Sequence, residues 1–162
     1  MKQEDIVEHK LQPAIRECQL HLKRLEYAVG QLKKVMPLNA DVWDSLDNPT
    51  VASIDQLLFR FVKLQDAMGA RLFPAILMAV SEWDESQTFL DKLHRLHKIG
   101  ALPSVSEWLE LRELRILATH EYPDAPEKNA ETVNLIHESV DQLSAIFSEA
   151  TKFSEPYINP EK

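Results

Sequence analysis

Apolar residues at alternating intervals of three and four positions recur along most of this chain, and they constrain its fold more than any other feature. The N-terminal stretch shows the pattern at Leu11, Ile15, Cys18, Leu22, Leu25, Val29, Leu32 and Met36. This spacing is typical of one face of a long helix, with a short leading segment that meets it at Pro13 and an end at Pro37. A single helix would leave that face in water, so several helices must pack together. Cys18 lies within the stripe and is interpreted as a small buried hydrophobe rather than a reactive thiol.

The same periodicity predicts two further helices in the middle of the chain. Residues 38–50 are rich in Asn, Asp and Pro and are predicted to form a loop with one short turn, after which a helix starts near Val51. Pro74 should kink or divide that helix. A helix over about residues 86–99 has cations in its last turn and is followed by Gly100 in the position of a left-handed cap.

Two more helical segments complete the predicted fold. Ser104 and Glu107 have the spacing of a capping box, so a helix should begin there. Pro123 disfavours helical geometry in the residue before it, so this helix should stop near Glu121. A last helix is expected over about residues 127–153. Four long amphipathic segments joined by short loops predict an all-α fold, an antiparallel four-helix bundle with up-down topology.

Length and composition predict one domain. The chain has 162 residues, of which 44% are hydrophobic and 27% charged, and this is typical of a globular domain with a sizeable core. We expect a single domain over residues 1–162, with a core over about 10–153 and a C-terminal tail over 154–162. The longest apolar stretch, residues 72–80, is far shorter than the ~20 residues of a membrane span, and no signal-peptide pattern follows Met1. A single cysteine excludes an internal disulfide, and together these features predict a cytoplasmic protein without a membrane partner.

The net charge of −8 limits the ways in which the chain can bind nucleic acid. Broad, sequence-independent binding needs many Lys and Arg residues to neutralise phosphates. An acidic protein can still hold a small, locally positive site. The charge therefore excludes sequence-independent binding along extended nucleic acid and remains compatible with a small local binding site.

The segment LRELRILATHEYPD, residues 111–124, places polar residues near the end of a helix that should be burying apolar ones. At about 100° per residue, Arg115 lies on the same side of the helix as Trp108 and Leu111. Two interpretations stay open. Arg115 either lies along the bundle surface and pairs with a carboxylate of another helix, or forms an anion site at a surface shared with a partner.

His120 follows Arg115 by five positions, which turns it roughly 140° away on a regular helix. The two side chains therefore converge on one site only if the helix end unwinds or a second protomer supplies one of them. Tyr122 projects from the helix terminus and should be reachable by another protein. The simpler interpretations are a helix C-terminal cation for His120 and a half-buried loop anchor for Tyr122.

The residues RILATHEY, Arg115 to Tyr122, contain an arginine, four residues, a histidine, one residue and a tyrosine. This pattern resembles the signature of the HEPN superfamily, and specifically of the HepT-like ribonuclease toxins that are paired with a small nucleotidyltransferase antitoxin. SIDQLLFRFVKLQDAMG, residues 53–69, is similar to the second helix of that family. The resemblance extends over roughly residues 10–150.

The resemblance implies a metal-independent endoribonuclease that needs no cofactor and acts on RNA in a cleft between the protomers of a homodimer or a higher complex. It implies that His120 is the general acid or base and that Arg115 holds the phosphate, roles that suit an imidazole and a guanidinium chemically. Since the attacking oxygen would be the ribose 2′-hydroxyl, the product should carry a cyclic phosphate end. Arg60, Thr119 and Arg112 are further candidates for supporting or binding the RNA.

The resemblance also implies a role for Tyr122. In these pairs the nucleotidyltransferase antitoxin transfers AMP to the tyrosine of the motif and thereby inactivates the toxin. An added phosphate and adenosine beside Arg115 would fill the cleft and compete for its positive charge. We therefore expect a cognate nucleotidyltransferase partner and adenylylation of Tyr122.

One departure from the family pattern favours a second hypothesis. The family commonly places a polar residue directly after the arginine, and here that residue is Ile116. Together with the acidic charge, this favours a non-catalytic helical protein that binds and regulates a nucleotidyltransferase. A third hypothesis is an unrelated helical bundle. The chain has no phosphate-binding glycine loop, so it is not itself expected to be the nucleotidyltransferase.

A metal centre is the weaker interpretation of the remaining histidines. Asp91, His94 and His97 are spaced three positions apart and could contact one zinc ion, but a tetrahedral site needs more ligands than these. Cations at a helix C-terminus explain the histidines more simply. No metal site is therefore predicted.

Overall fold

The computed structural model describes residues 1–161, and over those residues the protein is all-helical, without a β-strand. Its helical elements are α1 (Gln3–Ile6), the π-helical turn η1 (Val7–Leu11), α2 (Gln12–Leu32), α3 (Ala40–Trp43), α4 (Asn48–Ala67), the π-helical turn η2 (Met68–Leu72), α5 (Phe73–Ala79), α6 (Phe89–Ile99), α7 (Val105–Ala118) and α8 (Pro126–Ile158). The prediction of an all-α fold is confirmed. Within the described part of the chain, no helix has the length and apolar character that crossing a membrane requires.

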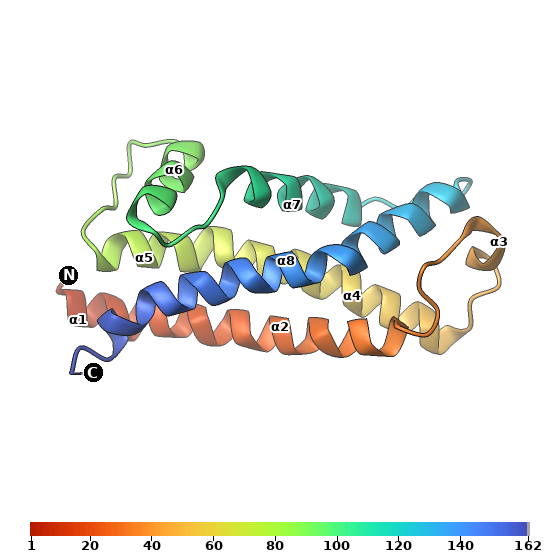
Figure 1. Ribbon diagram of the computed structural model, residues 1–162, viewed down its shortest axis with the longest axis horizontal. Helices are drawn as coiled ribbons and strands as arrows, with labels where there is room; N and C mark the ends of the chain where they lie inside the picture. The colour runs from red at the N-terminus through yellow and green to blue at the C-terminus, as the bar shows by residue number, and fades with distance from the viewer. Residues whose placement is uncertain (162) are drawn as a thin grey trace.

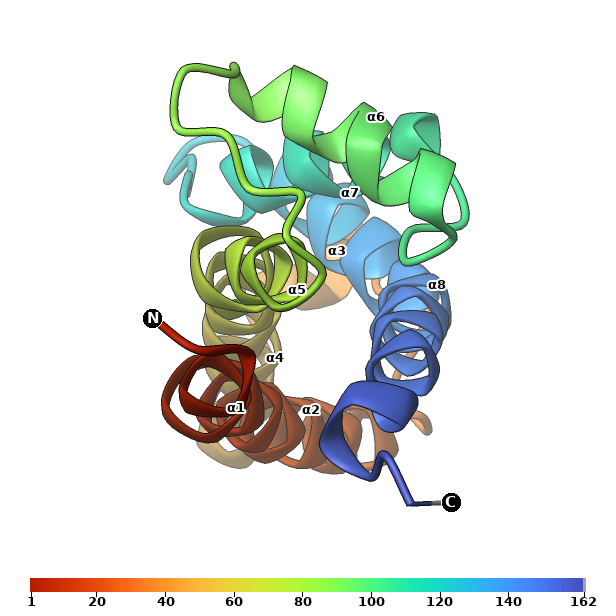
Figure 2. The same ribbon diagram turned by 90° about the vertical axis from the view of Figure 1, so that its left-hand side faces the viewer.

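The long helices form an antiparallel bundle (Figure 1). α2 lies beside the continuous rod formed by α4, η2 and α5, and α8 packs along both rods over almost the whole length of the molecule. α7 is about half as long as these rods. It packs on α8 and α4, as the end-on view shows (Figure 2). α3 packs against α8 near the end of the bundle where α7 stops. This end therefore brings together α3, the first turns of α4 and α8, and the segment after α7.

The core is built from the apolar stripes that the sequence predicts. Leu25 and Leu32 of α2, Leu57 of α4 and Leu143 of α8 are fully buried, and they belong to one continuous cluster. Cys18 is also fully buried, and burial raises the pKa of its thiol to about 12. Its interpretation as a core residue is confirmed.

The prolines at positions 13 and 74 are each preceded by a π-helical turn. η1 ends two residues before Pro13, and η2 ends two residues before Pro74. A proline offers no N–H, and its ring crowds the carbonyl four residues earlier, so widening the preceding turn lets the helix continue. Pro74 thus marks a local change in the rod, as predicted. At Pro13 the helix runs on from α1 through η1, so no separate leading segment ends there.

Four other boundaries differ from the predictions. α2 ends at Leu32, five residues before the expected end at Pro37, and the chain turns over residues 33–35 instead. α6 begins at Phe89 rather than near residue 86, because Thr88 forms a reciprocal capping box with Asp91. α4 begins at Asn48, because the Asp47 carboxylate caps the helix by accepting from the Thr50 N–H at 2.8 Å. α8 continues to Ile158, past the boundary expected at residue 153. Lys162, the last residue of the expected tail, lies outside the described residues.

Candidate functional site

The rotation of α7 about its axis is fixed by two buried residues near its start. The Ser104 hydroxyl caps the helix by accepting from the Glu107 N–H at 3.2 Å. Trp108 is 2% exposed and packs edge-on against Phe73, with ring centroids 4.8 Å apart, and Leu111 is 1% exposed. Because these side chains hold one face of α7 against the core, the residue seven positions after Trp108 emerges on the same side, beside α4.

That residue is Arg115, and it forms a bidentate ion pair with Asp66 of α4. Arg115 Nε donates to Asp66 Oδ1 at 2.7 Å, and a terminal guanidinium nitrogen donates to Oδ2 at 3.1 Å. The hydrogen bonds to Asp66 raise the pKa of the guanidinium above its ordinary value. The interpretation that Arg115 pairs with a carboxylate of another helix is confirmed. Two of its five N–H donors are occupied, and the other three are left for a further acceptor.

Arg115 lies at the edge of an open hollow of about 560 Å³ between α4, η2, α6 and α7. The hollow is lined by Gln65, Asp66, Gly69, Ala70, Phe89, Trp108, Arg112 and Arg115. The Arg112 guanidinium lies over the ring of Phe89, 5.0 Å from its centroid. With two guanidinium groups and one carboxylate, the charged lining of this hollow is net positive, which favours an anionic ligand.

α7 ends at Ala118, one turn earlier than predicted, because two side chains compete for the carbonyl of Ile116. The Thr119 hydroxyl donates to Ile116 O at 2.7 Å, and His120 Nδ1 lies 2.8 Å from the same oxygen. The backbone N–H of His120 bonds instead to Leu117 O, three residues back. The last turn therefore tightens and the helix terminates before Pro123 can act. The expected end near Glu121 is wrong for this reason.

The contact with Ile116 also determines which ring nitrogen of His120 can do chemistry. A carbonyl oxygen only accepts hydrogen bonds, so Nδ1 must carry a hydrogen and donate to it. Thr119 Oγ1 lies 3.4 Å from the same nitrogen, which further occupies that edge of the ring. The other nitrogen, Nε2, is the one left to exchange a proton, and the side chain is exposed.

Tyr122 is anchored by its backbone and keeps a half-exposed ring. Its backbone N–H donates to Asn129 Oδ1 at 3.1 Å, and its carbonyl accepts from Asn129 Nδ2 at 2.8 Å. Its ring is offset-stacked on His120, with centroids 6.3 Å apart and planes 15° apart. The Lys128 ammonium lies 4.1 Å from the centroid of the tyrosine ring. Asn129 is buried, so this clamp fixes the segment that carries both rings.

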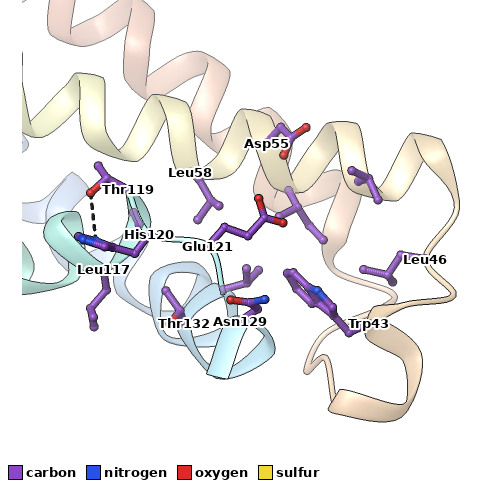
Figure 3. Close-up of a pocket in the computed structure, with 14 residues that line it drawn as sticks. Trp43, Leu46, Asp55, Leu58, Leu117, Thr119, His120, Glu121, Asn129 and Thr132 are labelled. Carbon is purple, nitrogen blue, oxygen red and sulfur yellow. Dashed lines mark hydrogen bonds between the residues drawn. The ribbon is translucent and has the colours of Figure 1, made fainter. Parts of the chain in front are cut away.

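His120 lines a second hollow, of about 280 Å³, at the end of the bundle (Figure 3). It is lined by Trp43, Leu46, Val51, Ile54, Asp55, Leu58, Leu117, Ala118, Thr119, His120, Glu121, Asn129, Thr132 and Val133. The figure shows Thr119 and His120 at one end, Trp43 and Leu46 at the other, and Glu121 between them. Arg115 does not line this hollow and His120 does not line the first. Within a single chain the two motif residues therefore face different hollows, and a site completed by a second protomer stays a prediction.

The other candidate site residues lie in different places. Arg112 lies with Arg115, and Thr119 lies with His120. Arg60 lies elsewhere: its guanidinium is 2.9 Å from His21 Nδ1 of α2 and over the ring of Phe59. The predicted contribution of Arg60 to the same site therefore has no contact to support it in a single chain.

Two residues of the weaker metal interpretation take part in ordinary helix-end contacts. The carboxylate of Asp91 accepts from the Thr88 N–H at 3.2 Å, as part of the capping box. His97 Nδ1 lies 3.0 Å from Leu102 O, in the segment that follows α6. α6 ends at Ile99, and Gly100, with a φ of 92°, forms the predicted left-handed cap. These contacts account for Asp91 and His97 without a ligand.

Three residues of these hollows were not singled out from the sequence. Asp66 borders the buried stripe of α4, and an acid at such a position is a weak signal for an ion pair between helices. Trp43 lies in a predicted loop, where a large aromatic residue signals an anchored turn. Glu121 was expected only as the end of α7, but that helix ends at Ala118 and Glu121 lines the second hollow. Comparison of the chain with family models, with curated proteins and with solved structures finds no match.

Proposed function

We propose that this protein is a HEPN-like, metal-independent endoribonuclease of the HepT-like toxin class, acting as a homodimer. The observation that carries the proposal is the orientation of His120. Its Nδ1 is held by the carbonyl of Ile116, its Nε2 is left for proton transfer, and the ring is exposed. An imidazole held in one tautomer at an exposed position has the arrangement that general acid-base catalysis requires.

The proposed reaction needs no cofactor and no water nucleophile. The ribose 2′-oxygen attacks the adjacent phosphorus and gives its proton to a base, while the bond from phosphorus to the 5′-oxygen breaks and that oxygen takes up a proton. His120 Nε2 serves in one of these proton transfers and solvent water in the other, and the products carry a 2′,3′-cyclic phosphate and a 5′-hydroxyl. The step is metal-independent.

Arg115 is the proposed phosphate clamp. Asp66 fixes its guanidinium at the edge of the positive hollow and leaves three N–H donors for the oxygens of a phosphate. Since Arg115 and His120 of one chain face different hollows, the proposed cleft combines Arg115 of one protomer with His120 of its partner. The partner chain is part of this proposal.

Tyr122 is the proposed site of inactivation by a partner nucleotidyltransferase. Its oxygen would attack the α-phosphorus of ATP on that enzyme, lose its proton and release pyrophosphate. The ring is stacked on His120, so an attached AMP would lie beside the imidazole and block RNA from it. Coexpression with an active partner should increase the mass of the intact protein by one AMP, and the Tyr122→Phe variant should keep its original mass.

A second candidate function is supported by two features of α7. Ile116, which follows the arginine, is 50% exposed, and Arg115 is already neutralised by Asp66. An exposed apolar residue beside a paired cation suits contact with a protein more than contact with RNA. This supports a non-catalytic helical partner that binds a nucleotidyltransferase.

Incubation of the purified protein with RNA in EDTA separates the two candidates. We expect cleavage that is lost in His120→Ala and in Arg115→Ala, with cyclic phosphate ends on the products. His9→Ala and Arg24→Ala are matched controls, because both residues are exposed and line neither hollow. RNA left intact by the unmodified protein, together with tight binding of a nucleotidyltransferase, would support the second candidate.

A further inference from the structure

The hollow beside His120 has the size of a site for one small planar group. Its volume of about 280 Å³ is just below the usual range for ligand pockets, roughly 300–1,000 Å³. It is formed where α3, the first turns of α4 and α8, and the segment after α7 meet, so no single helix defines it. This is room for one ring system rather than for a folded peptide.

The walls of this hollow supply a flat aromatic surface backed by the core. Trp43 is half-buried and packs against the hydrophobic core, as do Leu46 and Leu58. The core therefore holds the indole in place while part of it stays open to the hollow. An indole held in this way is suited to stacking on a nucleobase.

The charged groups of the hollow are mainly hydrogen-bond acceptors. Glu121 extends towards the start of α4, where Asp55 lies, with Trp43 on the neighbouring side (Figure 3). His120, at the far end, is the only residue of the lining that can carry a positive charge. Asn129 is already engaged with the backbone of Tyr122. Such a site disfavours a phosphate and favours a ligand whose edge presents N–H donors.

Guanine is the nucleobase whose edge fits these acceptors best. Its Watson–Crick edge presents two adjacent donors, N1–H and the 2-amino group, which match the two oxygens of one carboxylate. The corresponding edge of adenine offers one amino group beside an acceptor nitrogen, which a carboxylate would repel. Aromatic stacking together with edge hydrogen bonds is the usual way in which proteins recognise an unpaired RNA base.

We infer that this hollow binds a guanine base, stacked on Trp43 and paired through its N1–H and 2-amino group with the carboxylate of Glu121. Asp55 adds negative potential that favours the donor edge. The inference rests on the proposed function in one respect. His120 lines the same hollow, so the bound guanine would lie beside the bond that the proposed nuclease cleaves. Binding of the base itself requires no cleavage.

The test is a titration of the intact protein, in EDTA, with guanosine, inosine, adenosine and arginine amide. The probe signal is the indole N–H resonance of Trp43, identified by its loss in Trp43→Phe. Guanosine should shift it, while inosine, which lacks the 2-amino group, and adenosine should bind about tenfold more weakly. Glu121→Gln should weaken guanosine binding by about tenfold or more, and Glu113→Gln, an exposed glutamate of α7 outside the hollow, should not change it.

Equal affinity for adenosine and guanosine, or unchanged binding in Glu121→Gln, would overturn the inference. A response to arginine amide but not to guanosine would also overturn it, in favour of a protein side chain as the occupant. Arg115→Ala, at a residue outside this hollow, should still bind guanosine although it should not cleave RNA. Cleavage without a preference for guanine therefore contradicts only the base site, and guanosine binding without cleavage contradicts only the nuclease.

Discussion

Replacing Asp66 by Asn tests the role of Arg115 directly, because the change removes one charge and keeps the shape of the side chain. Both partners are partly exposed, 33% for Arg115 and 45% for Asp66, so solvent screens the pair. Ion pairs of this kind contribute about 0.2–1 kcal/mol, and the bidentate geometry places this pair near the upper end. A loss of about 1 kcal/mol lowers the Tm of a domain of this size by about 2–4 °C.

The same substitution should strengthen RNA binding. A phosphate held by the outer N–H groups of Arg115 would lie on the order of 7 Å from the Asp66 carboxylate, where two unit charges repel by about 0.6 kcal/mol at a dielectric constant of 80 and about 1.2 at 40. Removing that repulsion should raise the affinity by about threefold to eightfold at low salt. The gain should disappear near 1 M salt, where charges are screened within about 3 Å.

The assay is fluorescence anisotropy of a labelled single-stranded RNA, with His120→Ala as the parent protein so that the RNA stays intact. Asp141→Asn is the matched control, because Asp141 is exposed on α8 and lines neither hollow. An equal gain in RNA affinity in Asp66→Asn and Asp141→Asn would refute the reasoning, because the gain would then come from the change in net charge alone. A gain that persists when Arg115 is also replaced by Ala would refute it as well.

Three further predictions concern stability and reactivity. The hydrogen bond from Arg71 lowers the pKa of Glu17, so Glu17→Gln should destabilise the fold at pH 7 by at most about 1 kcal/mol. This loss of stability should fade as the pH falls below about 4.5 and through the lowered pKa of Glu17. Urea unfolding of both proteins at pH 7 and at acidic pH measures the difference. Cys18, whose thiol is buried and has a pKa raised to about 12, should react with a thiol reagent only in denaturant, and rapid reaction of the native protein would contradict its place in the core. Gly100→Ala should lower the free energy of unfolding by about 1–2 kcal/mol, because the φ of 92° is strained for alanine. Gly30→Ala, in an exposed and sterically open position of α2, should instead raise it by about 0.5–1 kcal/mol. Equal shifts of the melting temperature in the two variants would contradict this prediction.

The helices and their core faces could be predicted from the sequence because both depend on local order along the chain. The stripe through Cys18 and Leu25 is buried as its spacing indicates, and Gly100 adopts the left-handed cap expected after α6. The buried face of a helix follows from apolar residues three to four positions apart, and a cap depends on neighbours within one turn. Neither of them needs a contact that is distant in sequence. The end of α7 was misjudged, because Pro123 was the visible stop signal and the hydrogen bonds of Thr119 and His120 to one carbonyl were not.

The arrangement of the candidate site was decided by tertiary packing. Helical spacing alone is enough to place Arg115 on the buried side of its helix and to turn His120 away from it. Only the folded chain decided that Asp66 pairs with Arg115 and that His120 faces a different hollow with Trp43. The physical reason is that such contacts join helices separated by tens of residues in sequence. Their partners depend on which helix faces pack together and on the path of the chain after Ala118, and neither is encoded in a local spacing.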